Sequence, residues 1–257
     1  MWFRWLLVYL FALTSALDPA LAALTITNLN GFNKATVTAG APQAFPVIVS
    51  SATTATVGTS ATTTYAINLP ASVASGDMML MFLQYRRGNR LVTGFTQAWN
   101  TASSFNAGGG STWQAYVFWR ISDGTEGSST TVTITTGSEN VIATVFRITG
   151  AQSVGAGTTA NSVSAAPNPP NLSPSWGSAK TLWFIFISTP NGTLSLSAYP
   201  TNYSSSQTTV SAVPGNNLGQ RMWVAAYSNQ ASSEDPAAAT LSASDSWSAQ
   251  TVGVQPN

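Results

Sequence analysis

The 257-residue sequence contains no cysteine and no histidine, and only 7% of its residues are charged. Without cysteine the chain has no disulfide, no thiolate nucleophile and no cysteine-ligated metal. Without histidine it has no Ser-His-Asp or Cys-His catalytic arrangement, and the commonest zinc sites lose their ligands. We therefore expect no metal, no cofactor and no enzyme activity.

The few charges are balanced, with nine basic and eight acidic residues and a formal net charge of +1. Because no field of one sign exists, nucleic acid and anionic membranes are not expected as partners. Hydrophobic residues nevertheless make up 44% and aromatic residues 11%, which is not the composition of a disordered chain. We expect a folded protein whose polar surface consists of Ser, Thr, Asn, Gln and Gly.

Residues 1–22 have the pattern of a signal peptide. A basic start at Arg4 precedes an apolar run over residues 5–13, and the Asp18-Pro19 breaker precedes a small-x-small site at Ala20-Leu21-Ala22. The alternatives are an apolar segment docked inside an assembly, or a start codon upstream of a mature chain beginning near Ala23. The pattern predicts an exported protein, extracellular or on a virion surface, with an arm or linker over residues 23–44 and no membrane contact after cleavage.

From residue 45 onward, β-branched and aromatic runs alternate with turn residues, and no stretch keeps a helical period for three turns. The pattern predicts an all-β fold: a two-sheet antiparallel β-sandwich of jelly-roll or Greek-key type, forming one domain over residues 45–257. The clearest strands are expected at 77–85, 113–121, 130–136, 140–148, 180–188, 220–227 and 247–254. Weaker ones are expected at 45–50, 62–69, 162–165, 193–198, 208–212 and 238–242.

Two runs are apolar without alternation, residues 78–83 and 182–187. Such runs are typical of strands covered on both faces, so these two are expected in the centres of sheets. The proline-rich segment at residues 166–174 cannot join a ladder and predicts an extended crossover, with a domain boundary as the alternative.

Several motifs occur in an order that resembles a known module. Ser75-Gly76-Asp77 leads into an apolar strand, Val117-Phe118-Trp119-Arg120 precedes Asp123-Gly124-Thr125-Glu126, and residues 144–150 follow. The later half, from Pro169 to Pro256, continues the match in order. Over residues 62–257 the chain resembles a jelly-roll module that recurs in phage tail or virion proteins and in secreted bacterial surface proteins.

The resemblance implies a structural or adhesive role and a jelly-roll fold, and it carries no catalytic residue. The chain departs from the module at Arg86-Arg87-Gly88-Asn89-Arg90 and in its last strand. Those departures put a transfer of ligand specificity in doubt.

Two groups of side chains are candidates for ligand binding. Arg86, Arg87 and Arg90 form the one charge cluster, which could grip a phosphate or an acidic glycan, or could be a solvated hairpin tip. Among the nine tryptophans, those expected at strand edges or in loops could be exposed and stack on sugars, whereas the others belong in the core. These three are Trp99, Trp113 and Trp176.

The acidic residues fit turn chemistry better than catalysis. Asp77, Asp123 and Asp245 stand beside Gly or Ser at strand ends, where Asp caps turns, and Glu126 follows Gly-Thr. Glu234-Asp235 lacks the spacing of a Ca²⁺ loop and is typical of an exposed turn.

Three functions are open. The first is a non-enzymatic phage virion or tail-associated protein that forms homo-oligomers or packs on neighbouring proteins and presents loops to a host surface. The second is a secreted bacterial lectin-like module that binds cell-surface glycans. The third, a glycoside hydrolase or polysaccharide lyase, needs a pair of carboxylates and is the least supported by the acids present.

Overall fold

The computed structural model describes residues 24–25, 36–37, 43–56, 63–86, 90–107, 113–135, 140–204, 208–212 and 219–257. The chain divides into two compact units, Met1–Ala44 and Phe45–Asn257. In the first unit, β1 (Leu24–Thr25) pairs antiparallel with β2 (Thr36–Val37). The predicted signal peptide lies outside the described residues. Within the ranges given above, the chain has no helix with the length and apolar character needed to span a bilayer.

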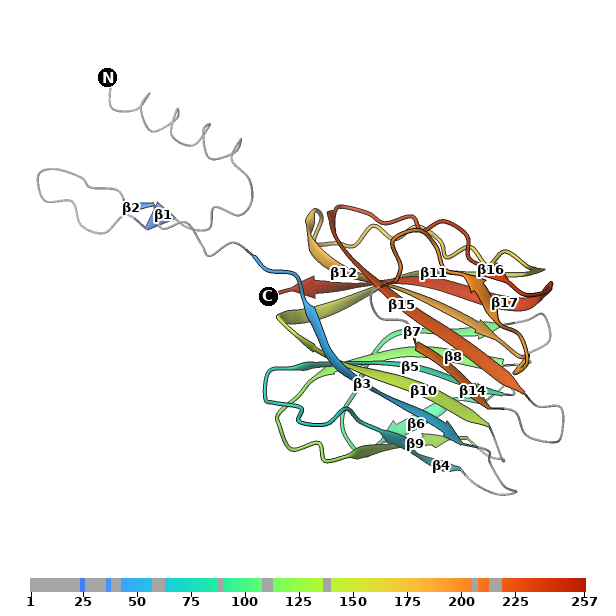
Figure 1. Ribbon diagram of the computed structural model, residues 1–257. Coiled ribbons are helices and arrows are strands. Elements are labelled where there is room, and N and C mark those ends of the chain that lie inside the picture. Colours follow the sequence, from blue (N-terminus) through green and yellow to red (C-terminus); the bar gives the residue numbers. More distant parts are fainter. Residues whose placement is uncertain are drawn as a thin grey trace, which may run out of the picture. The chain divides into compact units, whose positions relative to one another are not determined.

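The second unit contains two five-stranded antiparallel sheets, which Figure 1 shows stacked face to face. The first has the order β3 (Val47–Thr56), β10 (Val141–Thr149), β5 (Met78–Arg86), β8 (Trp113–Ile121) and β7 (Asn100–Ala107). The second has the order β11 (Ala151–Ser164), β17 (Asp245–Pro256), β12 (Ala179–Thr189), β15 (Gln220–Ala231) and β14 (Thr208–Ala212). The two sheets are the inner layers of the molecule.

Smaller sheets accompany the two inner layers. One has the order β4 (Thr64–Asn68), β9 (Ser129–Ile134) and β6 (Val92–Phe95), and the other pairs β13 (Leu196–Ala198) with β16 (Thr240–Leu241). The β4-β9-β6 sheet shares a buried cluster with the first five-stranded sheet, and a second outer cluster joins the other inner sheet to Leu196 and Leu241. Each inner sheet is therefore covered on both faces.

The strand β5 explains why a run without alternation is buried. Its even-numbered residues Met78, Leu80 and Phe82 belong to the central core between the two inner sheets. Its odd-numbered residues, such as Met79 and Met81, belong to the outer core beneath the β4-β9-β6 sheet. Successive side chains of a strand point to opposite faces, so both faces require apolar residues.

Aromatic rings hold the central core together across the two inner sheets. The ring centroid of Phe82 lies 6.1 Å from that of Phe146, 5.6 Å from Phe184 and 5.2 Å from Phe186. Each such aromatic pair adds about 0.5–1.5 kcal/mol beyond the burial of its area. The hydrophobic core thus couples the two sheets.

The two halves of this unit repeat one strand order. The first repeat comprises residues 45–150, and its inner sheet has the order β3-β10-β5-β8-β7. The second repeat comprises residues 151–257, and its inner sheet has the order β11-β17-β12-β15-β14. In both sheets, the strand that comes first in the repeat lies at one edge, beside the strand that comes last. The bridge between Leu172 and Glu234 takes the place of the pairing between β4 and β9. The two repeats meet at Gly150, which stands alone between β10 and β11.

Local details also match between the repeats. Leu69 and Leu172 both follow an asparagine, and their amides donate to Ser128 O and Glu234 O, each at 2.9 Å. The inner sheets pack reciprocally, since β3 lies beside β14 and β7 lies beside β11. The first strand of each repeat therefore lies beside the strand at the opposite edge of the other repeat's inner sheet, as in a two-fold symmetric dimer.

The structure confirms the all-β sandwich, and it confirms that β5 and β12 are central strands. The jelly-roll name stays a prediction. The proline-rich segment lies inside the second repeat, between β11 and β12, where Pro167 O accepts the Ala239 amide at 2.8 Å. The division between the repeats falls instead at Gly150.

Candidate functional site

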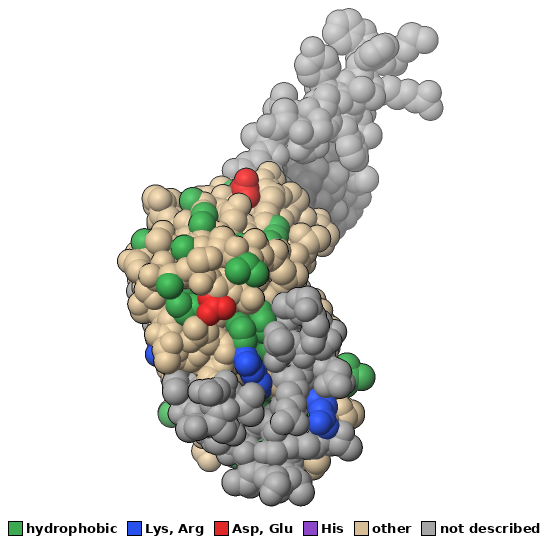
Figure 2. Space-filling view, turned by 90° about the vertical axis from the view of Figure 1, so that its right-hand side faces the viewer, with side chains coloured by type: hydrophobic (Ala, Val, Ile, Leu, Met, Phe, Trp, Pro, Cys, Tyr) green, Lys and Arg blue, Asp and Glu red, His purple; other side chains and the backbone are tan. Residues whose placement is uncertain are grey.

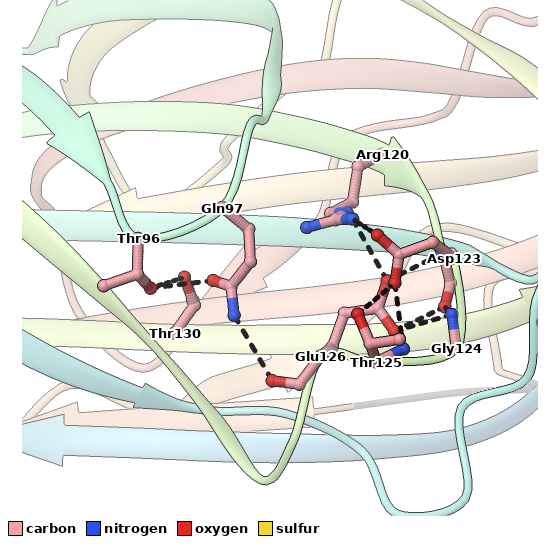
Figure 3. Close-up of polar contacts among 9 residues, drawn as sticks. Thr96, Gln97, Arg120, Asp123, Gly124, Thr125, Glu126 and Thr130 are labelled. Atoms are coloured by element: carbon pink, nitrogen blue, oxygen red, sulfur yellow. Dashed lines mark hydrogen bonds and ion pairs between the residues drawn. The ribbon is translucent and has the colours of Figure 1, made fainter.

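A group of ion-paired side chains lies at the turn that follows β8, drawn in Figure 3. The Asp123 carboxylate accepts hydrogen bonds from the Thr125 amide at 2.9 Å and from the Thr125 hydroxyl at 2.6 Å. Gly124 has a φ of 88°, in the left-handed region that favours glycine. These contacts form an Asx turn, which is the role expected for Asp123.

Glu126 is the buried centre of this turn, with its side chain 1% exposed. Its carboxylate accepts from the Ser122 hydroxyl at 2.6 Å, the Asp123 amide at 2.9 Å and the Gly124 amide at 3.2 Å. The Arg120 guanidinium lies 3.2 Å from the same carboxylate and 3.3 Å from that of Asp123, whose side chain is 63% exposed. The Glu126 carboxylate thus holds the turn in place.

The hydrogen bonds decide the protonation of both acids. Burial alone would raise the pKa of Glu126, but the Ser122 hydroxyl, backbone amides and Arg120 together bring that pKa below its ordinary value. Hydrogen bonds from the Thr125 hydroxyl and amide lower the pKa of Asp123. A general acid must hold its proton near neutral pH, so neither residue has the environment of one.

A second ion pair lies beside this turn on the same face of the first inner sheet. Met79 of β5 is opposite Arg147 on β10 and Arg120 on β8. The Arg147 guanidinium donates to the Asp77 carboxylate at 2.6 Å, and Asp77 also accepts the Ala74 amide at 2.8 Å. Both pairs close the end of the outer core. Nε and Nη1 of Arg120 are buried and have no partner in the described residues.

Arg86, a candidate for ligand binding or for a solvated hairpin tip, joins the two repeats instead. Its guanidinium donates to Pro190 O at 2.7 Å. Burial lowers the pKa of Arg86, and the nearby Asp245 carboxylate opposes that shift. Arg90, predicted to act with Arg86, donates to Thr135 O at 3.3 Å. Arg87 lies outside the described residues.

Trp113 and Trp176 also have structural roles. The expectation that Trp113 is exposed is wrong: it is 0% exposed, and its indole donates to the Ser188 hydroxyl across the inter-repeat core at 3.1 Å. The Trp176 ring lies against Gly155 and Gly253, a cross-strand pair, and its indole donates to Thr181 at 3.1 Å. Trp113 therefore has no open face for a sugar, whereas Trp176 is partly exposed and has the Gly155 and Gly253 pair against its ring.

Trp99 remains partly exposed, and its ring centroid lies 5.8 Å from that of Phe95. Its indole nitrogen is buried and has no partner in the part of the chain that the structure describes. The structure therefore does not bring Trp99 together with Trp113, Trp176 or Arg86 into one binding surface.

Two glutamines that the sequence reasoning missed complete the contacts between the repeats. Gln84 donates to Thr189 O at 2.8 Å, and Gln220 donates to Asn140 O at 2.7 Å. Both side chains are fully buried. The signal was present for Gln84, because a glutamine inside an apolar run must find a partner when it is buried.

Charged groups are few in this protein, since only 7% of its residues are charged. On the face drawn in Figure 2, hydrophobic and charged side chains are scattered among other residues. Within the described ranges, no three His, Cys, Asp or Glu residues are grouped as metal ligands would be. No protein-family model, no curated protein and no solved structure matches this chain.

Proposed function

We propose that this protein is a non-enzymatic structural or adhesive component of a surface assembly, most consistent with a virion or tail-associated protein that packs against copies of itself or neighbouring proteins. One observation carries the proposal: the charged turn and Arg86 are engaged in hydrogen bonds inside the fold, which leaves few charged groups on the outer surface. Burying a hydroxyl in a contact costs far less than burying an unpaired charge.

The order of sequence motifs, with its resemblance to a jelly-roll module of phage and secreted proteins, supports the same proposal. An exported or particle-bound location agrees with the signal-peptide pattern of residues 1–22. Glycan binding is the second function considered from the sequence. It loses support because Trp113 is buried and Arg86 bonds to the second repeat.

The proposal is tested by locating the protein in the cells or particles that contain it. Antibodies against the purified chain, used in immunogold electron microscopy, are expected to label particles or the outer cell surface. N-terminal sequencing of the labelled material is expected to begin near Ala23. Label confined to the cell interior, on a chain beginning at Met1, would contradict the proposal.

A further inference from the structure

The outermost strands of the two inner sheets contain no charged residue. Both long edge strands, β3 with the sequence VIVSSATTAT and β11 with AQSVGAGTTANSVS, also lack proline. Charges, especially lysine, and proline are two common means by which proteins prevent pairing at sheet edges. The arginines of this unit that the structure describes within inner-sheet strands lie instead on β5, β8, β10 and β15. The edges are therefore chemically suited to accept another strand.

Only part of each edge strand is covered on its outer side. On β3, the side chain of Asn68 donates to Thr53 O at 2.9 Å, and the Asn68 amide donates to Thr54. On β11, Gly157 lies close to Asn171 O and Leu172. Among the described residues, the backbones of residues 47–52 and 158–163 have strand partners only on β10 and β17, their neighbours within the sheets, and Val49 and Thr158 lie at register shifts of those pairings.

Exposed valines mark the uncovered parts. Val47 and Val49 are 56% and 48% exposed at the start of β3, and Val163 is 71% exposed near the end of β11. Because these valines lie at opposite ends of their strands, only an antiparallel pairing brings them together. Val47 opposite Val163 places Ala52 opposite Thr158, so that the two uncovered segments coincide in one register.

We infer that β3 of one molecule pairs antiparallel with β11 of a second copy, through residues 47–52 and 158–163, joining two inner sheets into one. The inference rests on the proposed assembly function and specifies its contact. Backbone hydrogen bonds would supply the attraction, as in strand addition to a sheet edge, and burial of the three valines would add to it.

Because each molecule contains two repeats, this contact can extend from one molecule to the next. β3 and β11 are the first strands of the two repeats, so their pairing joins equivalent elements, yet it leaves β11 of one molecule and β3 of the other free. A contact between different surfaces that does not close on itself extends into a chain of molecules or a ring.

The test uses the purified full chain and two lysine substitutions at exposed serines. Ser51→Lys blocks β3 and Ser162→Lys blocks β11, and Ser228→Lys, at an exposed serine of β15, which pairs with neither of these edge strands, is the matched control. Light scattering over the micromolar to submillimolar range is expected to show growing mass for the wild type and the control, and loss of growth for both edge variants. An equal mixture of the two edge variants is expected to form dimers and nothing larger, because each supplies the edge that the other lacks.

Dimers of Ser51→Lys alone, or no dimers in the mixture, would overturn the pairing of β3 with β11 and leave assembly through another surface in place. A monomeric wild type would also overturn it, whereas the surface location proposed above is judged separately by immunogold labelling. If either variant loses its β-sheet circular dichroism, Val49→Lys and Val163→Lys replace them at the same edges.

Discussion

Glu126 shows how a residue type that suggests chemistry can be used for structure. Its buried carboxylate accepts three hydrogen bonds and lies 3.2 Å from Arg120. Removing one member of a buried pair leaves the other charge without compensation, at a cost of about 3–5 kcal/mol. Glu126→Gln is expected to lower the free energy of unfolding in urea by about that amount.

The control for this change is Asp123→Asn, which affects an exposed partner of the same arginine. An exposed ion pair contributes about 0–1 kcal/mol, and asparagine keeps an oxygen that can accept the hydrogen bonds from Thr125. Equal losses for both variants would show that Glu126 is not the centre of the turn.

Glu126, which is buried, and Glu234, which is partly buried, are expected to give opposite pH dependence. The pKa of Glu126 is lowered in the folded state, so its contribution to stability is complete above the ordinary value of 4.5 and is lost as the pH falls through the lowered pKa. Burial raises the pKa of Glu234, so its contribution is complete below 4.5 and is lost as the pH rises through the raised pKa.

Urea unfolding at a series of pH values measures both effects. Relative to wild type, Glu126→Gln is expected to flatten the loss of stability in acid, whereas Glu234→Gln is expected to flatten the loss on the alkaline side of 4.5. The difference in free energy of unfolding between wild type and each variant is plotted against pH. Slopes of the same sign for the two variants would contradict these pKa directions.

At the scale of strands, the cross-strand pair of Gly155 and Gly253 provides the surface on which Trp176 lies. A Cβ atom on Gly155 would approach the Trp176 ring to 3.0 Å. Gly155→Ala is therefore expected to displace the ring and lower the free energy of unfolding by about 1–3 kcal/mol.

Gly94→Ala is the matched change, because a Cβ atom there meets nothing within 4 Å. Its free energy of unfolding is expected to change by less than about 1 kcal/mol. Chemical denaturation compares the two variants, and a neutral Gly155→Ala would show that the contact between Trp176 and the glycine pair carries little stability.

The sequence predicted best the strands whose pattern of apolar residues directly reflects their burial. Two-sided burial makes residues 78–83 of β5 and 182–187 of β12 apolar without a break, so both strands were predicted as central. β6, β7 and residues 151–161 of β11 were missed, because edge and surface strands rich in Ser, Asn and Gly resemble loops. The Asx turn at Asp123 was predictable because its hydrogen bonds are local.

The site residues were harder to predict, because their contacts are not local in the sequence. Whether Arg86 or Trp113 faces solvent depends on contacts with the second repeat. For Arg86, the partner lies about a hundred residues further along the chain. Only the fold brings Pro190 to Arg86 and Ser188 to Trp113. A junction of one residue at Gly150, without a linker composition, likewise gave no sign of the boundary between the repeats.

At the scale of the whole molecule, the central core makes the two repeats depend on each other. Phe82 of the first repeat contacts Phe184 and Phe186 of the second. Phe82→Ala is expected to cost about 3–5 kcal/mol and to lower stability in both repeats together. Far-ultraviolet circular dichroism and tryptophan fluorescence are expected to report one coincident transition; two separated transitions would show that the repeats unfold independently.

Three points of the chain meet at the junction between the repeats. The Asn257 amide donates to Gly150 O at 3.0 Å, and Gly150 lies near the backbone of Phe45 and Pro46. The compact unit therefore begins, changes repeat and ends at one place. This arrangement permits a circular permutant of the unit. A short linker from Asn257 to Phe45, with new chain ends at Gly150, would place the second repeat before the first without moving a strand.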